Sequence, residues 1–428
     1  MKPFRLLALI AATVAIASLT LPTRKPAAAM SELKLRNADI AFYESRVQRD
    51  PASAADVAQL AGLYLQRSRE TGDFDDYRRA EASARRSLSL RTARNGKTYL
   101  TLASSLLAQH KFVEALEIAE KLVSLEPEVN AYRALLAEIQ LELGDYERAR
   151  SNFDSLADAR YELAVAPRMA RWQEIQGNSE SARRILFAAQ REAESRTGMP
   201  REQVAWFHLR VGDHEFRNGR LDEAERAFER GLETEPGDFR LLSALARVEG
   251  ARGNWKRVIE YGERIGAAGD ISTLGLIGDA YKELDDSSAA ERFYREAERT
   301  GRTKPEPFNR QWTMFLLDHD REQYEVRALL EREIGIRRDV YGYDQLAWAL
   351  YKTGEYEAAR DASRAALRMG TRDAMIYYHA GVIESALGDQ KAAARFLGEA
   401  LAINPVFHPR QARAAQQMLS AIGGAAFR

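Results

Sequence analysis

The feature that most constrains this chain is a short amphipathic segment that recurs along it. In the clearest copy, Gly219 to Pro236, the residues Leu221, Ala224 and Phe228 fall on one face of a helix and charged residues fall on the other. A second helix is predicted just before it, with Asn218-Gly219 as the turn between the two. A single helical hairpin cannot bury its own apolar face. It must therefore stack against copies of itself.

The copies follow at intervals of about 34 residues. Gly219 is followed at this distance by Gly253, and Gly354 is followed likewise by Gly388. Gly144 opens another example, Gly-Asp-Tyr-Glu-Arg-Ala, and prolines close several units (Pro127, Pro236 and Pro405). A chain of 428 residues would ordinarily suggest two or three globular domains. The period instead predicts one elongated array with a continuous core.

On these residues the chain resembles the tetratricopeptide repeat family. That repeat pairs a small residue in its first helix with a Gly-Asp-Tyr turn, followed by Ala, an aromatic residue, Ala and Pro. The resemblance covers nearly the whole chain after the N-terminus. It implies an all-α fold, an α-solenoid of stacked helix-turn-helix repeats forming a right-handed superhelix. It also implies a protein that binds other proteins or peptides on its surfaces.

The pattern divides the chain into seven regions. A longer loop, Thr197-Gly198-Met199-Pro200, separates two halves of the array, and Lys304-Pro305-Glu306-Pro307 disfavours helix at the start of a weaker repeat. The predicted regions are an export signal or membrane anchor (1–29), an N-terminal cap helix (30–53), the first half of the repeats (54–200), the second half (201–304), a degenerate repeat (305–338), the C-terminal repeats (339–407) and a capping helix with a tail (408–428).

The N-terminus has the layout of an export signal. Lys2 and Arg5 precede an uncharged run from Leu6 to Leu21. Two interpretations fit this run: cleavage, after Ala15-Ile16-Ala17 or Ala27-Ala28-Ala29, or retention as an uncleaved anchor bounded by positive residues on both sides. We therefore expect an exported, periplasmic or extracytoplasmic protein that is either free or tethered by this segment.

Composition narrows the classes of partner. The chain has no cysteine, which excludes disulfides, thiol chemistry and lipidation of a cysteine. Its formal net charge is +0, from 63 basic and 63 acidic residues, so no long-range attraction to nucleic acid or to an anionic membrane is expected. We predict a protein or peptide partner, no nucleic acid, and membrane contact only through the N-terminal segment.

No pattern in the sequence predicts catalysis, a metal site or a cofactor. Asn95-Gly96-Lys97-Thr98 lacks the first glycine of a phosphate-binding loop and is interpreted as a helix start. His208 and His214 are six residues apart, and Asp318-His319-Asp320 is a polar turn; neither has the spacing of metal ligands. We therefore predict a protein that is not an enzyme.

The resemblance implies that first helices line the concave wall of the superhelix. Arginine forks recognise carboxylates, so the middle of the groove is predicted to bind an acidic or C-terminal peptide. The alternative is that these arginines pair with neighbours such as Asp213 and Glu174. The predicted binding residues here are Arg168, Arg171, Arg210, Arg217, Arg240 and Arg247, with Trp206 and Phe216 among them.

Towards the C-terminus the corresponding positions hold aromatic residues: Tyr341, Trp348, Tyr351 and Tyr378. Aromatic side chains supply contact area at low entropic cost, so this part of the groove is predicted to take an apolar or extended peptide. For Trp348 and Tyr378 the alternative is packing between helices. The carboxylate clamp of chaperone-binding family members is missing, because its asparagine position holds Arg171, Asp213 and Arg247 among others.

The main hypothesis is a non-catalytic, exported scaffold or adaptor that binds a partner protein or an extended peptide in its concave groove. One alternative is an accessory subunit of an envelope, secretion or polysaccharide-export enzyme complex. Another, from a different class, is a hydrolase or transferase with a site in the groove. An N-terminal tether would favour the scaffold, and a tight single partner would favour the accessory subunit. Carboxylates or histidines that converge beside a pocket would favour the hydrolase or transferase.

Overall fold

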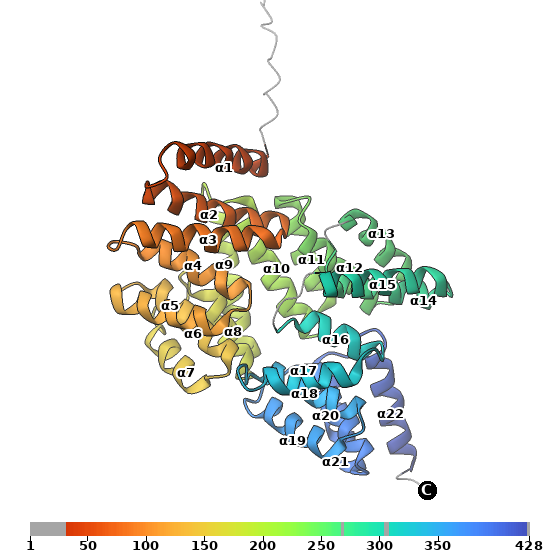
Figure 1. Cartoon of the computed structure of the whole chain (residues 1–428). Coiled ribbons are helices and arrows are strands. Elements are labelled where there is room, and N and C mark those ends of the chain that lie inside the picture. Colours follow the sequence, from red (N-terminus) through yellow and green to blue (C-terminus); the bar gives the residue numbers. More distant parts are fainter. Residues whose placement is uncertain (1–30, 267–268, 304–307, 426–428) are drawn as a thin grey trace, which may run out of the picture.

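The computed structural model describes residues 31–266, 269–303 and 308–425, and these form 22 helices without a strand (Figure 1). This confirms the predicted all-α solenoid. Within this part of the chain, no helix has both the length and the hydropathy that a membrane span requires. The predicted export signal or anchor, 1–29, and the proline-containing start of the degenerate repeat, 304–307, lie outside the described residues.

After a single first helix, consecutive helices pair into ten hairpins from α2 to α21, and a last helix follows. The first eleven helices are α1 Glu32–Arg49, α2 Ala54–Thr71, α3 Phe74–Leu90, α4 Gly96–Ala108, α5 Phe112–Leu125, α6 Asn130–Leu143, α7 Tyr146–Ser155, α8 Ala166–Ile175, α9 Ser179–Ser195, α10 Arg201–Arg217 and α11 Leu221–Thr234. The remaining helices are α12 Phe239–Ala251, α13 Trp255–Ile265, α14 Ile271–Glu283, α15 Ser287–Thr303, α16 Arg310–Asp318, α17 Gln323–Glu333, α18 Val340–Lys352, α19 Tyr356–Leu367, α20 Ala374–Ala386, α21 Gln390–Ile403 and α22 Gln411–Ala425.

The hairpin of α10 and α11 shows why the repeat needs small residues. Phe228 of α11 is fully buried against Gly212 of α10, where an added Cβ would lie 2.2 Å from the phenyl ring. Ala224 and Ala227 are also buried on the same face of α11. Glycine at 212 therefore lets the two helices approach closely around one large aromatic side chain, as the sequence pattern predicts.

The hydrophobic core continues across the loop that separates the predicted halves. One buried cluster includes Ala134 and Trp172 before this loop, Phe207 and Ala227 after it, and Val340 from a much later repeat. The array is therefore packed as one unit through residues 197–200.

The hairpin of α16 and α17 makes its turn without glycine. Asp320 and Glu322 adopt positive φ angles of 55° and 46°. Non-glycine residues in this region cost about 1–3 kcal/mol each, so this turn is more strained than the turn of the following hairpin, which has Gly354 at a positive φ angle. Phe315, Leu316 and Leu317 of α16 are nevertheless buried in the C-terminal core.

The superhelix coils tightly enough for distant repeats to touch (Figure 1). The Arg338 N–H donates to the Leu143 carbonyl at 3.0 Å, Thr371 Oγ1 donates to the Ile175 carbonyl at 2.6 Å, and Asn404 Nδ2 donates to the Phe216 carbonyl at 2.8 Å. We call this line of contacts the seam. It joins Leu143–Tyr146, Ile175–Gly177 and Phe216–Gly219 to Arg337–Val340, Gly370–Thr371 and Asn404–Pro405.

Glycines allow this close approach. Gly144 and Gly177 both have positive φ angles. A Cβ on Gly144 would lie 2.3 Å from the Arg338 carbonyl oxygen, and a Cβ on Gly177 would lie 2.4 Å from the Gly370 carbonyl oxygen. Gly354 and Gly388 occupy the same turn position in the last repeats, yet a Cβ there would meet no described atom within 4 Å. The glycine turn thus has a second role wherever the superhelix closes on itself.

Candidate protein-binding surface

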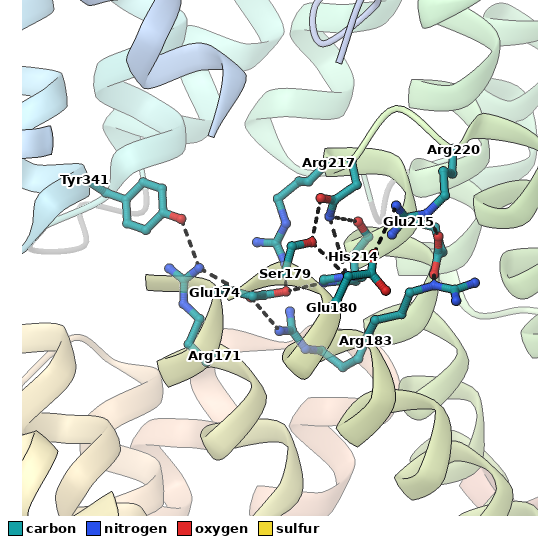
Figure 2. Close-up of polar contacts among 12 residues, drawn as sticks. Arg171, Glu174, Ser179, Glu180, Arg183, His214, Glu215, Arg217, Arg220 and Tyr341 are labelled. Atoms are coloured by element: carbon teal, nitrogen blue, oxygen red, sulfur yellow. Dashed lines mark hydrogen bonds and ion pairs between the residues drawn. The ribbon is translucent and has the colours of Figure 1, made fainter. Parts of the chain in front are cut away.

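Three of the predicted arginines converge on one carboxylate, that of Glu174 (Figure 2). Arg171 and Glu174 are one turn apart on α8. Arg210 and Arg217 are two turns apart on α10 and lie on the same face of that helix. The packing of two consecutive hairpins therefore builds the group. We call Arg171, Arg210, Arg217 and Glu174 the arginine cluster.

The two oxygens of Glu174 differ in their contacts. Oε1 lies 2.8 Å from Arg217 Nη2 and 2.8 Å from His214 Nδ1. Oε2 lies 3.8 Å from guanidinium nitrogens of both Arg171 and Arg210, which is beyond hydrogen-bond distance. Among the described residues, Oε2 is buried and accepts no hydrogen bond. Two guanidinium groups thus face the carboxylate without donating to it.

The charges of the cluster are strongly coupled. Burial raises the pKa of Glu174, but the charge of Arg217, the hydrogen bond from His214 and the charge of Arg210 outweigh it and hold that pKa far below its usual range. Burial lowers the pKa of Arg210. The carboxyl is therefore ionised, and three guanidinium groups share one negative charge. The side chains of Arg171, Arg210 and Arg217 remain 22%, 19% and 33% exposed, so solvent reaches them.

The tertiary structure adds a residue from a distant repeat to the cluster. Arg171 Nη1 donates to Tyr341 Oη at 3.1 Å, and the Arg171 guanidinium lies 4.6 Å from the centre of the Tyr341 ring. Arg310 of α16 also lies over this ring, at 5.4 Å. Burial raises the pKa of Tyr341, which keeps its hydroxyl protonated. Tyr341 was predicted as an aromatic contact of the C-terminal repeats; the structure places it beside the arginines instead.

A second polar network supports the cluster from α9 (Figure 2). Ser179 Oγ donates to Asn218 Oδ1 at 2.6 Å and lies 3.4 Å from His214 Nε2, while His214 Nδ1 faces Glu174. The order Ser179, His214, Glu174 is that of a nucleophile, a base and an orienting acid. However, the hydroxyl proton is directed to Asn218, so the arrangement is better suited to holding His214 in place.

Three other predicted arginines are paired with carboxylates of neighbouring helices. Arg168 Nε lies 2.7 Å from Glu138 Oε2, and Arg247 Nη2 lies 2.6 Å from Asp213 Oδ1. Arg240 Nη1 lies 2.7 Å from Glu202 Oε1 and also pairs with Asp238.

The two apolar residues predicted among the arginines have aromatic contacts of their own. The ring of Phe216 lies 5.4 Å from the Arg247 guanidinium, and Trp206 packs edge-on against Phe207 at 5.2 Å. The structure therefore shows the alternative for Arg168, Arg240 and Arg247: these three arginines pair with neighbouring carboxylates.

Two of the predicted aromatic contacts are core residues. Trp348 and Tyr378 are only 5% and 6% exposed, which corrects the expectation that they face an open groove. The Trp348 ring stacks on Tyr351 at 5.0 Å and on His379 at 4.2 Å, and Tyr378 lies 5.5 Å from Phe407. Packing between helices buries them because α20 of the next hairpin covers α18. Tyr351 is half-buried in the same stack.

The sequence did not single out His214 or Tyr341 as members of one site. His214 lies four residues after Arg210 and three before Arg217, so helical periodicity alone could have placed it on their face. Nothing in the sequence could have placed Tyr341 there, because it lies 170 residues from Arg171 along the chain. Within the described ranges, no group of three or more His, Asp or Glu side chains is arranged to hold a metal ion.

Comparisons with known proteins agree with this architecture. Models of the tetratricopeptide repeat match residues 106–166, 205–248, 271–299 and 345–406. A search of curated proteins finds no match to this sequence.

A search of solved structures finds similar proteins. They include the human IFIT1 dimer with m7Gppp-AAAA, at 16% identity over 74% of this chain and 72% of that chain, with a TM-score of 0.50. A tetratricopeptide repeat protein from Parabacteroides merdae has 18% identity over 64% and 99%, with a TM-score of 0.41. Yeast Tom70 has 11% identity over 92% and 93%, with a TM-score of 0.36. At these identities the likeness concerns the fold alone.

Proposed function

Because this chain is a tetratricopeptide repeat protein, we propose that it is a non-catalytic scaffold that binds an acidic segment of a partner protein at its arginine cluster. The observation that supports this most is the geometry at Glu174, where Arg171 and Arg210 face an ionised carboxylate without donating to it. Guanidinium groups that are partly buried and only partly paired gain most from a second carboxylate.

A partner carboxylate would complete the hydrogen bonding of this group. The cluster holds three positive side chains and one negative one, so an acidic side chain or a C-terminal carboxylate reduces the local charge imbalance. Tyr341 adds a hydroxyl and an aromatic face beside Arg171. Aspartate, glutamate and a terminal carboxylate all present the planar pair of oxygens that a guanidinium fork matches.

We place the scaffold outside the cytoplasm, because the run Leu6–Leu21 after Lys2 and Arg5 has the layout of an export signal or anchor. Its partner would then be a protein of the cell envelope. An accessory subunit of an envelope, secretion or polysaccharide-export complex remains the alternative. Fractionation of the full chain, followed by mass spectrometry of its N-terminus, separates a cleaved, free protein from a tethered one.

The binding test uses a fluorescent hexaglutamate peptide and the full chain. We expect Arg171→Glu and Arg217→Glu to weaken binding at least about tenfold each, because a charge-assisted hydrogen bond contributes about 1.5–3 kcal/mol. Arg226→Glu is the matched control: this residue is 61% exposed on α11, and its substitution makes the same charge change away from the cluster. Equal binding by all three variants would refute the proposed site.

A second arm uses Glu174→Gln, which removes the internal carboxylate. If Glu174 competes with a partner for the arginines, this variant binds hexaglutamate more tightly than the natural chain. Weaker binding, with circular dichroism unchanged, would mean that Glu174 positions the arginines and is not a competitor. Affinity capture from native envelopes with the same variants then identifies the partner.

A serine hydrolase is a second candidate, favoured only by the order Ser179, His214, Glu174. Ser179 borders a surface hollow of about 700 Å³, which would admit a substrate. A fluorophosphonate probe tests this directly, with Ser179→Ala as the control. The scaffold proposal expects no labelling of Ser179, because its hydroxyl donates to Asn218 and not to His214.

A further inference from the structure

We propose that the inner face of α14 and α16 is a docking surface for a basic helical segment of a partner, and that the chain's own residues Phe407–Arg413 occupy it until that partner replaces them. This site is separate from the arginine cluster and does not depend on it. It lies where the loop after α21 and the start of α22 contact α14 and α16.

The docking surface is acidic and the segment on it is basic. Arg410 Nη2 lies 3.4 Å from Asp279 Oδ2 of α14, and Arg413 Nη2 lies 2.9 Å from Glu283 Oε1 of the same helix. The amide of Gln411 donates to Asp318 Oδ1 of α16 at 2.9 Å. Two arginines one helical turn apart therefore match two carboxylates one turn apart.

The chain's own segment fits this surface incompletely. A cavity of about 260 Å³ remains between the segment and the repeats. Its apolar lining comes from Phe216, Leu276, Met314 and Phe315 on the repeats and from Phe407 and Pro409 on the segment. A segment with a larger apolar side chain at this point would fill the space and gain dispersion contacts that the chain's own residues do not make.

The last helix is held by little apolar burial. In α22 the buried side chains are small or polar, namely Gln411, Ala412 and Ala415, whereas Met418 and Leu419 are only half-buried. By contrast, α20 buries Ile376, Tyr378, Val382 and Ile383. Besides the buried Ala412 and Ala415, the start of α22 is held by polar contacts of Arg410, Gln411 and Arg413, and a competing basic segment can replace these polar contacts.

The binding experiment uses a fluorescent synthetic peptide with the sequence of residues 404–425 and the full chain. The peptide is expected to bind weakly to the natural chain and at least about tenfold more tightly to the full-length variant Arg410→Glu/Arg413→Glu, whose own segment is repelled by Asp279 and Glu283. A peptide with Trp in place of Phe407 is expected to bind more tightly still, because it enlarges a side chain that borders the cavity. Equal, weak binding to both chains would overturn the proposal.

Two controls keep the result interpretable. Arg413 is 55% exposed and Glu283 is 27% exposed, so Arg413→Glu alone is expected to fold, and adding Glu283→Arg restores the ion pair and blocks the peptide again. Hydrogen exchange on the natural chain is expected to show faster exchange in α22 than in α20. Equal protection of the two helices, or a dimer of the natural chain in sedimentation experiments that exchanges α22 between copies, would overturn the proposal.

Discussion

Two turns with nearly the same sequence have different surroundings in this molecule. Gly144-Asp145-Tyr146 lies between α6 and α7, and Gly354-Glu355-Tyr356 lies between α18 and α19. Both glycines have positive φ angles, of 76° and 87°. Yet Tyr146 is 6% exposed and its hydroxyl accepts the Val340 N–H at 2.8 Å, whereas Tyr356 is 39% exposed. The first turn is part of the seam, whereas the second lies outside it and contacts neighbouring helices, through the ion pair of Glu355 with Arg327 and the ring of Tyr356 beside Tyr351.

The comparison shows that position in the array, and not the repeat pattern, decides what a turn contributes. A local pattern fixes the hairpin in both places. Only the coiling of the superhelix brings Arg338 and Val340 against the turn at Gly144. A substitution at the seam should therefore destabilise the protein more than the matched substitution elsewhere wherever the side chain takes part in the seam, and four pairs of variants test this.

The largest difference in stability is expected between substitutions of the two turn glycines, Gly144 and Gly354. Gly144→Ala should destabilise the protein by roughly 2–5 kcal/mol, since a left-handed residue costs about 1–2 kcal/mol and overpacking against Arg338 about 1–3 more. Gly354→Ala should cost only about 1–2 kcal/mol, because its surroundings are open. Urea unfolding followed by circular dichroism compares them. Equal losses would mean that the seam does not persist in solution.

The second largest difference is expected on acidification, which should weaken the seam at Glu142, because the Glu142 carboxylate pairs with Arg337 of the seam. Burial raises the pKa of Glu142, but the charges of Arg337, Arg310 and Arg171 outweigh it and lower that pKa from 4.5 to about 2. A lowered pKa stabilises the fold above 4.5, and this contribution is lost as the pH falls from 4.5 towards 2. The difference in Tm between the natural chain and Glu142→Gln should therefore be largest near pH 6 and shrink by pH 3. Glu357→Gln, at an exposed site of α19, controls for the loss of one carboxylate.

Substitution of the two turn tyrosines should give a smaller difference in the free energy of unfolding. Tyr146→Phe removes the acceptor of the buried Val340 N–H and should cost about 1–3 kcal/mol. Tyr356→Phe should stay within about 0.5 kcal/mol, as exposed substitutions do. Hydrogen exchange at Val340 supplies the local readout: its protection should fall in the first variant alone. Unchanged protection would show that water replaces the hydroxyl without loss.

Removal of a helix cap should destabilise the protein equally at a turn of the seam and at a turn outside it. Asp145 accepts the Arg148 N–H at 3.4 Å, and Asp389 accepts the Ala392 N–H at 3.0 Å. Both contacts are local to one helix, so Asp145→Ala and Asp389→Ala should each cost about 1 kcal/mol. A markedly larger loss for Asp145 would show that its side chain also supports the seam.

Individual site residues were predicted unevenly. The resemblance assigns Arg210 and Arg217 to the groove side of a first helix, and in the structure both side chains face Glu174. The sequence also identified Glu174 as a neighbour that could pair with the arginines, and it does so with three of them. It did not separate groove positions from core positions for Trp348 and Tyr378, because both environments favour a large aromatic side chain on a first helix.

The sequence by itself determined the fold of each hairpin and the order of stacking. The reason is physical: Gly212 and Phe228, or Gly144 and Tyr146, act within one hairpin, through helix periodicity and turn geometry, and their effect repeats along the chain. Only the tertiary structure decided how tightly the superhelix coils. Small rotations between successive repeats add up over many units, and no single position encodes their sum. That sum brought Tyr341 to Arg171 and the start of α22 to α14.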